Sequence, residues 1–146
     1  MDINNYGVKF IQYHEGLSLK AYKCGGGFWT IGYGHKMKEG DASDISIHRA
    51  KELLLNDIMI IKKPALNMIK VILNENQIDS IISFVYNVGL AAFERSTLRQ
   101  KINYGDHFAV KTEFLKWIYS KGILLKGLFI RRTNEANLFC GNKIFL

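Results

Sequence analysis

Residues 15–35 read EGLSLKAYKCGGGFWTIGYGH, and this stretch is the most informative part of the 146-residue chain. The consecutive glycines at positions 25–27 can adopt backbone angles that other residues resist. They predict a turn between two short antiparallel strands, residues 19–23 and 28–33. A hairpin of this kind brings side chains from both strands onto one shared face.

Three reactive side chains lie around this predicted turn: Glu15 before the first strand, Cys24 at the turn and Thr30 on the returning strand. Each has an ordinary structural explanation when taken alone. A free Cys often packs as a small apolar residue, and Thr is common in strands. The hairpin would nevertheless let the acid, the thiol and the hydroxyl face one cleft, so we treat them as candidate catalytic residues.

The N-terminus is predicted to form an amphipathic helix. Asp2 can cap this helix, and apolar residues from Ile3 to Ile11 fall on one face. The segment lacks the basic start and the apolar core of a secretory signal peptide. The chain also has no apolar run of about 20 residues, so stable membrane insertion is not expected.

Cap residues predict further helices along the chain. Ser46 and Asp106 can each cap a helix, and Asn74 with Gln77 three residues later resembles a capping box. Pro64 is expected to interrupt the helix that follows Ser46 or to start the next one.

The C-terminal half is predicted to be entirely helical. Gly122 and Gly127 are expected to mark a loop before a final helix that ends near Gly141 and buries Cys140. With the short sheet in the N-terminal half, this pattern predicts a small α+β fold.

Composition describes a globular and basic protein. Hydrophobic residues make up 48% of the chain, and the formal net charge is +7. Such a surface attracts polyanions, which include nucleic acid, anionic lipid and bacterial cell wall. No dense block of Lys and Arg and no zinc-finger pattern is present, so nucleic acid is not expected as a partner.

The two cysteines, Cys24 and Cys140, do not make a disulfide framework. They fit either two reduced thiols or one bridge in an oxidising compartment. No closely spaced pair of Cys or His ligands occurs, so neither a metal nor another cofactor is expected. His35, which closes the glycine-rich stretch, is interpreted as a structural partner.

The spacing of Glu15, Cys24 and Thr30 resembles the signature of the phage-type lysozymes, the endolysins of glycoside hydrolase family twenty-four. That signature is a Glu, eight residues, an Asp or sometimes a Cys, five residues and a Thr, as found here. Most relatives have Asp where this chain has Cys24. Further similar positions occur in order along the chain: Thr30 to His35, Gln77, Ser83-Phe84, Tyr86-Asn87, Gly89, Ser96 to Leu98, Trp117, Arg131-Arg132 and Glu135.

The resemblance implies a single lysozyme-like domain over residues 1–146. It would have an N-terminal lobe with a short β-sheet at about 1–60 and a connecting helix at about 60–74. A helical C-terminal lobe at about 75–146 would complete it, with the cleft between the two lobes.

The resemblance also implies the chemistry. Glu15 would be the general acid that protonates the leaving oxygen, and Thr30 would orient the attacking water. Cys24 would need to ionise, since a free thiol has a pKa of about 8.5, and the nearby Lys20 and Lys23 are candidates for lowering it. Both water activation and direct attack by sulfur remain open.

Other site residues follow from the same resemblance. Either Arg131 or Arg132 is expected near Glu15, where it would orient the carboxyl group. Sugar contacts are expected from Trp29, Tyr33, Tyr86, Asn87 and Ser96, although core packing explains the aromatic residues equally well.

The implied activity is an endolysin of the muramidase type. It would hydrolyse the β-1,4 bond between N-acetylmuramic acid and N-acetylglucosamine in the peptidoglycan glycan strand. We expect a monomer that is made in the host cytoplasm without a signal peptide. It would act at the wall, in the periplasm, after a separate holin-type partner releases it.

Three other functions stay open at this point. The first is a chitinase or a lytic transglycosylase on a related fold. The second is a catalytically impaired glycan-binding protein, and the third is a membrane-active basic protein acting through residues 128–139.

Overall fold

The computed structural model describes residues 5–142 of the chain. The chain forms two compact units, Met1–Ile60 and Ile61–Leu146, and the helix α2 (Ile47–Asn67) contributes to both. Helices and a small antiparallel sheet together give the expected α+β class.

The first unit begins with the helix α1 (Tyr6–Glu15). Asn5 caps this helix, because its side chain accepts a hydrogen bond from the backbone N–H of Gly7 at 2.8 Å. Asp2 and Ile3, which the sequence placed in this helix, lie outside the described residues. Gly16 ends the helix with a φ of 71°, and Phe10 and Ile11 are buried.

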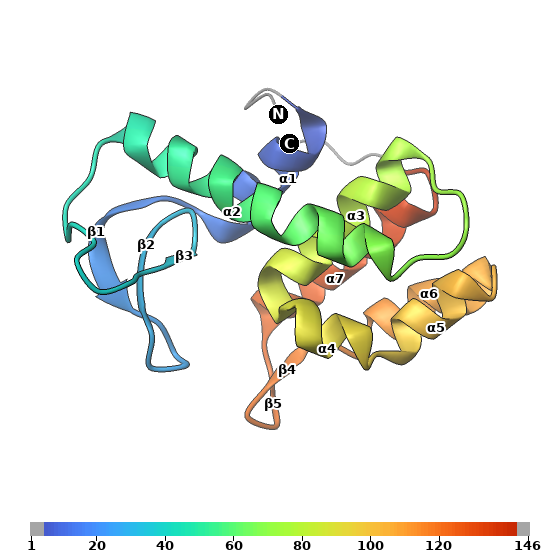
Figure 1. The fold of residues 1–146 in the computed structure, drawn as a ribbon. Coiled ribbons are helices and arrows are strands. Elements are labelled where there is room, and N and C mark those ends of the chain that lie inside the picture. The colour runs from blue at the N-terminus through green and yellow to red at the C-terminus, as the bar shows by residue number, and fades with distance from the viewer. Residues whose placement is uncertain (1–4, 143–146) are drawn as a thin grey trace. The chain divides into compact units, whose positions relative to one another are not determined.

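The predicted hairpin is confirmed and is extended by a third strand. β1 (Ser18–Lys23) pairs antiparallel with β2 (Trp29–Gly32), which in turn pairs with β3 (His35–Lys36). The three strands and the turn between β1 and β2 are drawn in blue in Figure 1. The register places Tyr22 opposite Thr30 and Lys23 opposite Trp29.

The prediction for Pro64 is wrong, because α2 continues through it to Asn67. Pro64 is exposed in the last turn of the helix, while the next residue, Ala65, is fully buried. A proline near the end of a helix costs less than one in its middle, since little of the helix depends on the lost hydrogen bond. The predicted cap is confirmed, with the Ser46 hydroxyl accepting from the backbone N–H of Arg49 at 3.0 Å.

The second unit is built mainly from short helices around a buried aromatic cluster. α3 (Glu75–Val88) carries the predicted capping box of Asn74 and Gln77 and packs against α7 (Lys126–Phe139). Between them lie α4 (Leu90–Glu94), α5 (Thr97–Asn103) and α6 (His107–Phe114), the last capped by Asp106 as predicted. Phe84 of α3 makes edge-on contacts with Phe93, Phe114 and Trp117.

Three predictions for this unit are wrong. It is not entirely helical, because β4 (Tyr119–Ser120) and β5 (Ile123–Leu124) form a hairpin around Gly122, and Gly127 lies inside α7. Cys140 is exposed, because α7 ends at Phe139 and the cysteine follows as its C-cap. Cys140 and the partly buried Cys24 are both free thiols.

Candidate functional site

The three-stranded sheet of the first unit has two faces with different chemistry. Residues directly opposite each other on antiparallel strands point to the same face. Tyr22, Thr30 and Lys36 are paired in this way and define what we call the Thr30 face. Trp29 alternates with Thr30 along β2, so it lies on the other face, which we call the Trp29 face.

Glu15 is positioned by the end of α1 and by the turn between β2 and β3. It is the last residue of the helix and is half-buried. Its carboxyl group lies against Gly34, where the φ is +77° and an added Cβ would overlap Glu15 Oε1 and lie 3.0 Å from its Cδ. A side chain at position 34 would displace the carboxyl group, so the glycine allows Glu15 to lie against the backbone of the turn.

Cys24 opens the glycine turn predicted from the sequence. Its backbone N–H donates to the carbonyl of Phe28 at 2.9 Å, and its own carbonyl accepts from Gly27 at 2.9 Å. These bonds close the turn around Gly27, whose φ of 85° favours glycine. The thiol is only partly buried and therefore accessible to a ligand.

The surroundings of the sulfur favour the thiolate. Hydrogen bonds from the backbone at Gly26 and then Phe28 lower the pKa of Cys24 below its ordinary value. The Thr30 hydroxyl and the charge of Lys36 act in the same direction, and partial desolvation opposes them. The structure thus assigns to Lys36 the electrostatic influence that the sequence suggested for Lys20 or Lys23.

Thr30 joins this group from the adjacent strand. Its side chain is 5% exposed, and its hydroxyl lies 3.3 Å from the carbonyl oxygen of Phe28. The same hydroxyl contributes to the lowered pKa of Cys24, so Thr30 lies close to the thiol as well as to the turn.

Tyr22 is a candidate site residue that the sequence reasoning missed. Burial raises the pKa of its phenol, and the neighbouring charges of Glu15 and Cys24 raise it further. Tyr22 therefore lies within electrostatic range of both the acid and the thiol, on the same face as Thr30. No local signal in the sequence identifies it, because its position opposite Thr30 depends on the register between β1 and β2.

Trp29 and Tyr33 differ in their relation to this group. Trp29, predicted as a sugar contact, lies on the opposite face of the sheet from Thr30 and is 55% exposed. Tyr33 is half-buried and immediately precedes Gly34, which touches Glu15.

Comparison with known proteins assigns the chain to a family. The family model described as phage lysozyme matches residues 12–135, which include Glu15, Cys24 and Thr30. The chain belongs to the phage lysozyme family.

Individual relatives agree with this assignment along nearly the whole chain. The endolysin of Acyrthosiphon pisum secondary endosymbiont phage 1 is 41% identical over 143 residues, covering 95% of this chain and 98% of that protein. The muramidase domain of SpmX from Asticaccaulis excentricus has a TM-score of 0.85 at 30% identity, covering 94% of this chain and 97% of that one. A crystal structure of a mutant P22 lysozyme has a TM-score of 0.79 at 32% identity, with 96% and 99% covered.

These similarities confirm the lysozyme-like α+β fold and the resemblance found in the sequence. This phage lysozyme is a glycoside hydrolase of the muramidase type, and it functions in the degradation of bacterial cell wall.

Three of the predicted sugar contacts lie in the second unit. Tyr86 is half-buried and Asn87 is exposed, both near the C-terminal end of α3. Ser96 is 3% exposed, and its hydroxyl caps α5 by accepting from the backbone N–H of Arg99 at 3.1 Å. The same hydroxyl donates to the carbonyl of Phe93 at 2.7 Å, so its polar atom is occupied within the fold.

Arg131 and Arg132 share a buried ion cluster with Glu135 in the second unit. Glu135 Oε2 lies 3.2 Å from Arg131 Nε, and Glu135 Oε1 lies 2.7 Å from Arg132 Nε. Ser83 of α3 completes the cluster, donating from its hydroxyl to Glu135 at 2.5 Å. These contacts tie α7 to α3, and the approach of either arginine to Glu15 stays a prediction.

His35 has the structural role that the sequence suggested. It is 7% exposed, and its Nδ1 lies 2.6 Å from an oxygen of Asp57 in α2. Its Nε2 lies 3.4 Å from Asp41, in the loop before that helix. Burial raises the pKa of Asp57, whereas the backbone N–H of Lys38 lowers the pKa of Asp41. His35 thus links β3, the loop and α2.

Two further findings concern residues 5–142 as a whole. No group of three or more His, Cys, Asp or Glu side chains in this range could hold a metal ion. None of the helices in this range combines the length and the apolar character needed to cross a bilayer.

Proposed function

We propose that this phage lysozyme hydrolyses the β-1,4 bond between N-acetylmuramic acid and N-acetylglucosamine in peptidoglycan, with Glu15 as general acid. The observation that carries the proposal is the grouping of Glu15, Tyr22, Cys24 and Thr30 around one face of the sheet. An acid and a thiolate in the same group of residues can supply the two functions that glycoside hydrolysis needs.

Glu15 donates its proton to the glycosidic oxygen as the bond between that oxygen and the anomeric carbon breaks. Its position against Gly34 limits the directions in which the carboxyl group can turn. The raised pKa of Tyr22 keeps the phenol protonated at neutral pH, so Tyr22 can donate a hydrogen bond within the site.

Cys24 acts as the base on the other side of the reaction. Its thiolate takes a proton from a water molecule, and the oxygen of that water forms the new bond to the anomeric carbon. The lowered pKa of Cys24 supports this role, because a neutral thiol is a poor base. Thr30 holds the thiolate through its hydroxyl and helps to orient the water.

The stereochemistry of the product tests the role of Cys24. Water activation is a single displacement and inverts the anomeric centre, whereas direct attack by sulfur followed by hydrolysis retains it. We expect inversion in NMR spectra recorded during cleavage of a soluble oligosaccharide, and a retained centre would show that the sulfur attacks directly.

The substitution Glu15→Gln tests the proposed function as a whole. It keeps the shape of the side chain but removes the proton donor, and general acid catalysis contributes about 10²–10⁴-fold to such rates. Muropeptide analysis after incubation with purified sacculi should show new reducing muramic acid ends for the wild type and almost none for the variant. Retention of more than about a tenth of the wild-type rate would exclude Glu15 as the acid, and anhydro sugars would indicate a transglycosylase.

We also propose that the enzyme works as a monomer and reaches the wall in the periplasm with the help of a holin-type partner. The similarity to endolysins supports this. Expression in a bacterial host should cause lysis when a holin is produced with it and not when the enzyme is produced alone. Lysis at equal rates in both cultures would contradict the need for a partner.

A further inference from the structure

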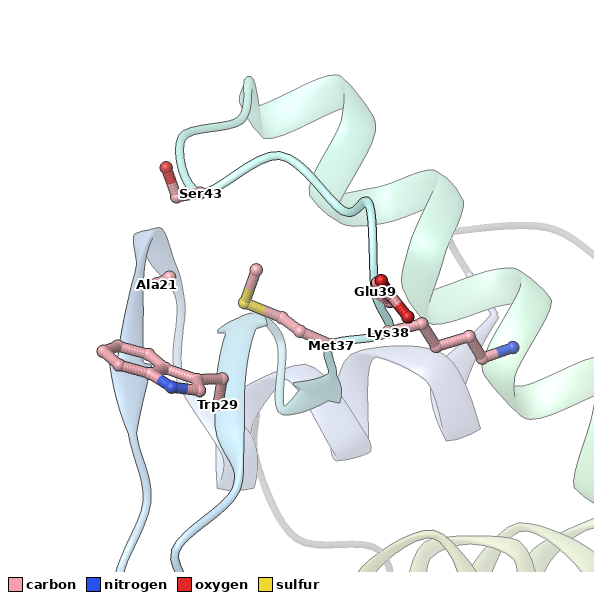
Figure 2. A pocket seen from close by; sticks show the side chains of 6 residues that line it. All are labelled: Ala21, Trp29, Met37, Lys38, Glu39 and Ser43. Carbon is pink, nitrogen blue, oxygen red and sulfur yellow. The ribbon is translucent and has the colours of Figure 1, made fainter.

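The Trp29 face of the sheet carries a pocket that the catalytic proposal does not use. It has a volume of about 390 Å³ and is lined by Ala21, Trp29, Met37, Lys38, Glu39 and Ser43 (Figure 2). Because Trp29 and Thr30 alternate along β2, this pocket and the Thr30 face lie on opposite sides of the same strands. The pocket is therefore separate from the Glu15 and Cys24 site.

The walls of the pocket are held in place by backbone hydrogen bonds. The N–H of Met37 donates to the carbonyl of Trp29 at 2.9 Å, and the N–H of Ala21 donates to the carbonyl of Ser43 at 2.9 Å. The loop between these residues is closed by Asp41, which accepts from the N–H of Lys38 at 2.7 Å. A ligand would therefore meet a preformed site and not a loose loop.

The lining combines an aromatic surface with polar groups at its edge. Figure 2 shows the Trp29 indole on one side, the Ser43 hydroxyl on the other and the Met37 side chain reaching between them. Lys38 extends away from the indole in the same view. Among the described residues, neither the Ser43 hydroxyl nor the Glu39 carboxylate makes a hydrogen bond or an ion pair, so both can serve a ligand.

We propose that this pocket binds one N-acetylhexosamine ring of a glycan strand, apart from the bond that is cleaved. A sugar ring has an apolar face of C–H groups, which suits the electron-rich face of an indole. Its hydroxyl and acetamido groups lie at the ring edge, where the Ser43 hydroxyl can donate or accept and the Glu39 carboxylate can accept. The volume falls in the range of about 300–1,000 Å³ that is usual for pockets of small ligands.

This inference rests on the proposed function only in that both concern a peptidoglycan glycan. A second glycan contact would keep the enzyme bound to the wall after one product has left the Thr30 face and before the next bond is cleaved there.

Binding measurements in the Glu15→Gln background separate this proposal from catalysis, because that variant should not digest the wall. In NMR titrations with tri-N-acetylglucosamine, we expect the Trp29 indole N–H signal to shift and to saturate. In co-sedimentation with purified sacculi, we expect Trp29→Leu to weaken binding by about three- to tenfold, the scale of one aromatic contact. Glu39→Ala should weaken it in the same direction.

Phe108→Leu is the matched control, because Phe108 is 93% exposed on α6 and does not line the pocket. Circular dichroism should show that all the variants are folded. Equal retention of Trp29→Leu and the parent on sacculi would overturn the proposal, as would a Trp29 signal that shifts only with stem peptide. Digestion by Glu15→Gln would contradict the proposed function alone, since the NMR titration does not depend on it.

Discussion

At the scale of single residues, Cys24 can act on a water molecule only as a thiolate, so its immediate neighbours determine whether it contributes. The backbone at Gly26 and Phe28 has the largest effect, followed by the Thr30 hydroxyl, and the charge of Lys36 adds the smallest lowering contribution to the pKa of Cys24. Most of the activation is therefore built into the fold of the glycine turn, and it needs no neighbouring histidine.

The pH dependence of Cys24 alkylation tests this order of causes. Because its pKa is lowered, more of the thiol is ionised at a given pH, and the midpoint of iodoacetamide reaction should lie below that of a free cysteine. Thr30→Val should raise the midpoint, and Lys36→Met should raise it less. The measurements belong in a Cys140→Ser background, since Cys140 is exposed and would also react. Identical midpoints in the parent protein and the two variants would show that neither Thr30 nor Lys36 lowers the pKa of Cys24.

Gly34 offers a second test at this scale. Gly34→Ala should reduce the rate on sacculi by at least about tenfold, because the added Cβ would push the Glu15 carboxyl group out of place. A tenfold loss corresponds to an activation barrier that is higher by about 1.36 kcal/mol. Gly40→Ala is the matched control, since Gly40 has a similar φ of +88° but nothing within 4 Å of an added Cβ. Equal losses in the two variants would mean that backbone strain, and not displacement of Glu15, causes the effect.

The site residues differ in how far the sequence predicts them. Glu15, Cys24 and Thr30 can be proposed from the sequence, because their spacing and the neighbouring glycines lie within one short stretch of the chain. Lys36 and Tyr22 do not, because their nearness to Cys24 depends on strand register. Lys20 and Lys23 are closer to Cys24 in sequence, yet a third strand, which the sequence did not suggest, brings Lys36 within electrostatic range of the thiol.

At the scale of helices and strands, local chemistry again predicts more than packing does. Ser46, Asn74 and Asp106 cap helices as expected, because a cap needs only the next few residues of the chain. The β4–β5 hairpin was missed because strands of two residues carry no alternating pattern. Cys140 was assigned to the core by extending the pattern of α7 one residue beyond its end.

The packing of α3 on α7 gives the prediction for this scale. Glu135 is fully buried, so Glu135→Gln would leave the buried guanidinium groups of Arg131 and Arg132 without its negative charge. Removing one partner of a buried ion pair costs about 3–5 kcal/mol. Urea unfolding should show that the free energy of unfolding falls by this amount.

Glu113→Gln is the control for this loss. Glu113 is also largely buried, and its Oε2 lies 2.7 Å from Lys116 Nζ. The Lys116 side chain is 62% exposed, so this ion pair reaches solvent. We expect it to cost less than about 1 kcal/mol. A comparable loss in both variants would show that the Glu135 cluster has no special role in holding α3 and α7 together.

At the scale of the whole molecule, the fold class and the family are predictable from the sequence because many weak signals agree along the chain. The Glu15, Cys24 and Thr30 spacing, the aromatic positions of the second unit and the Arg131-Arg132 pair with Glu135 occur in the expected order. Net charge, by contrast, is a property of the whole surface, and it bears on how the enzyme finds its substrate.

The net charge of +7 predicts that salt lowers the rate of wall digestion by weakening binding to the wall, and not by slowing the chemical step. Electrostatic attraction between a basic protein and an anionic wall acts over about 8 Å at physiological ionic strength and about 3 Å at 1 M salt. Rates on intact sacculi should therefore fall as salt is added, while rates on a short neutral oligosaccharide should change little. Both substrates present the same kind of bond to the proposed catalytic residues. An equal fall on both would therefore place the effect of salt in the chemical step and rule out attraction to the wall as its cause.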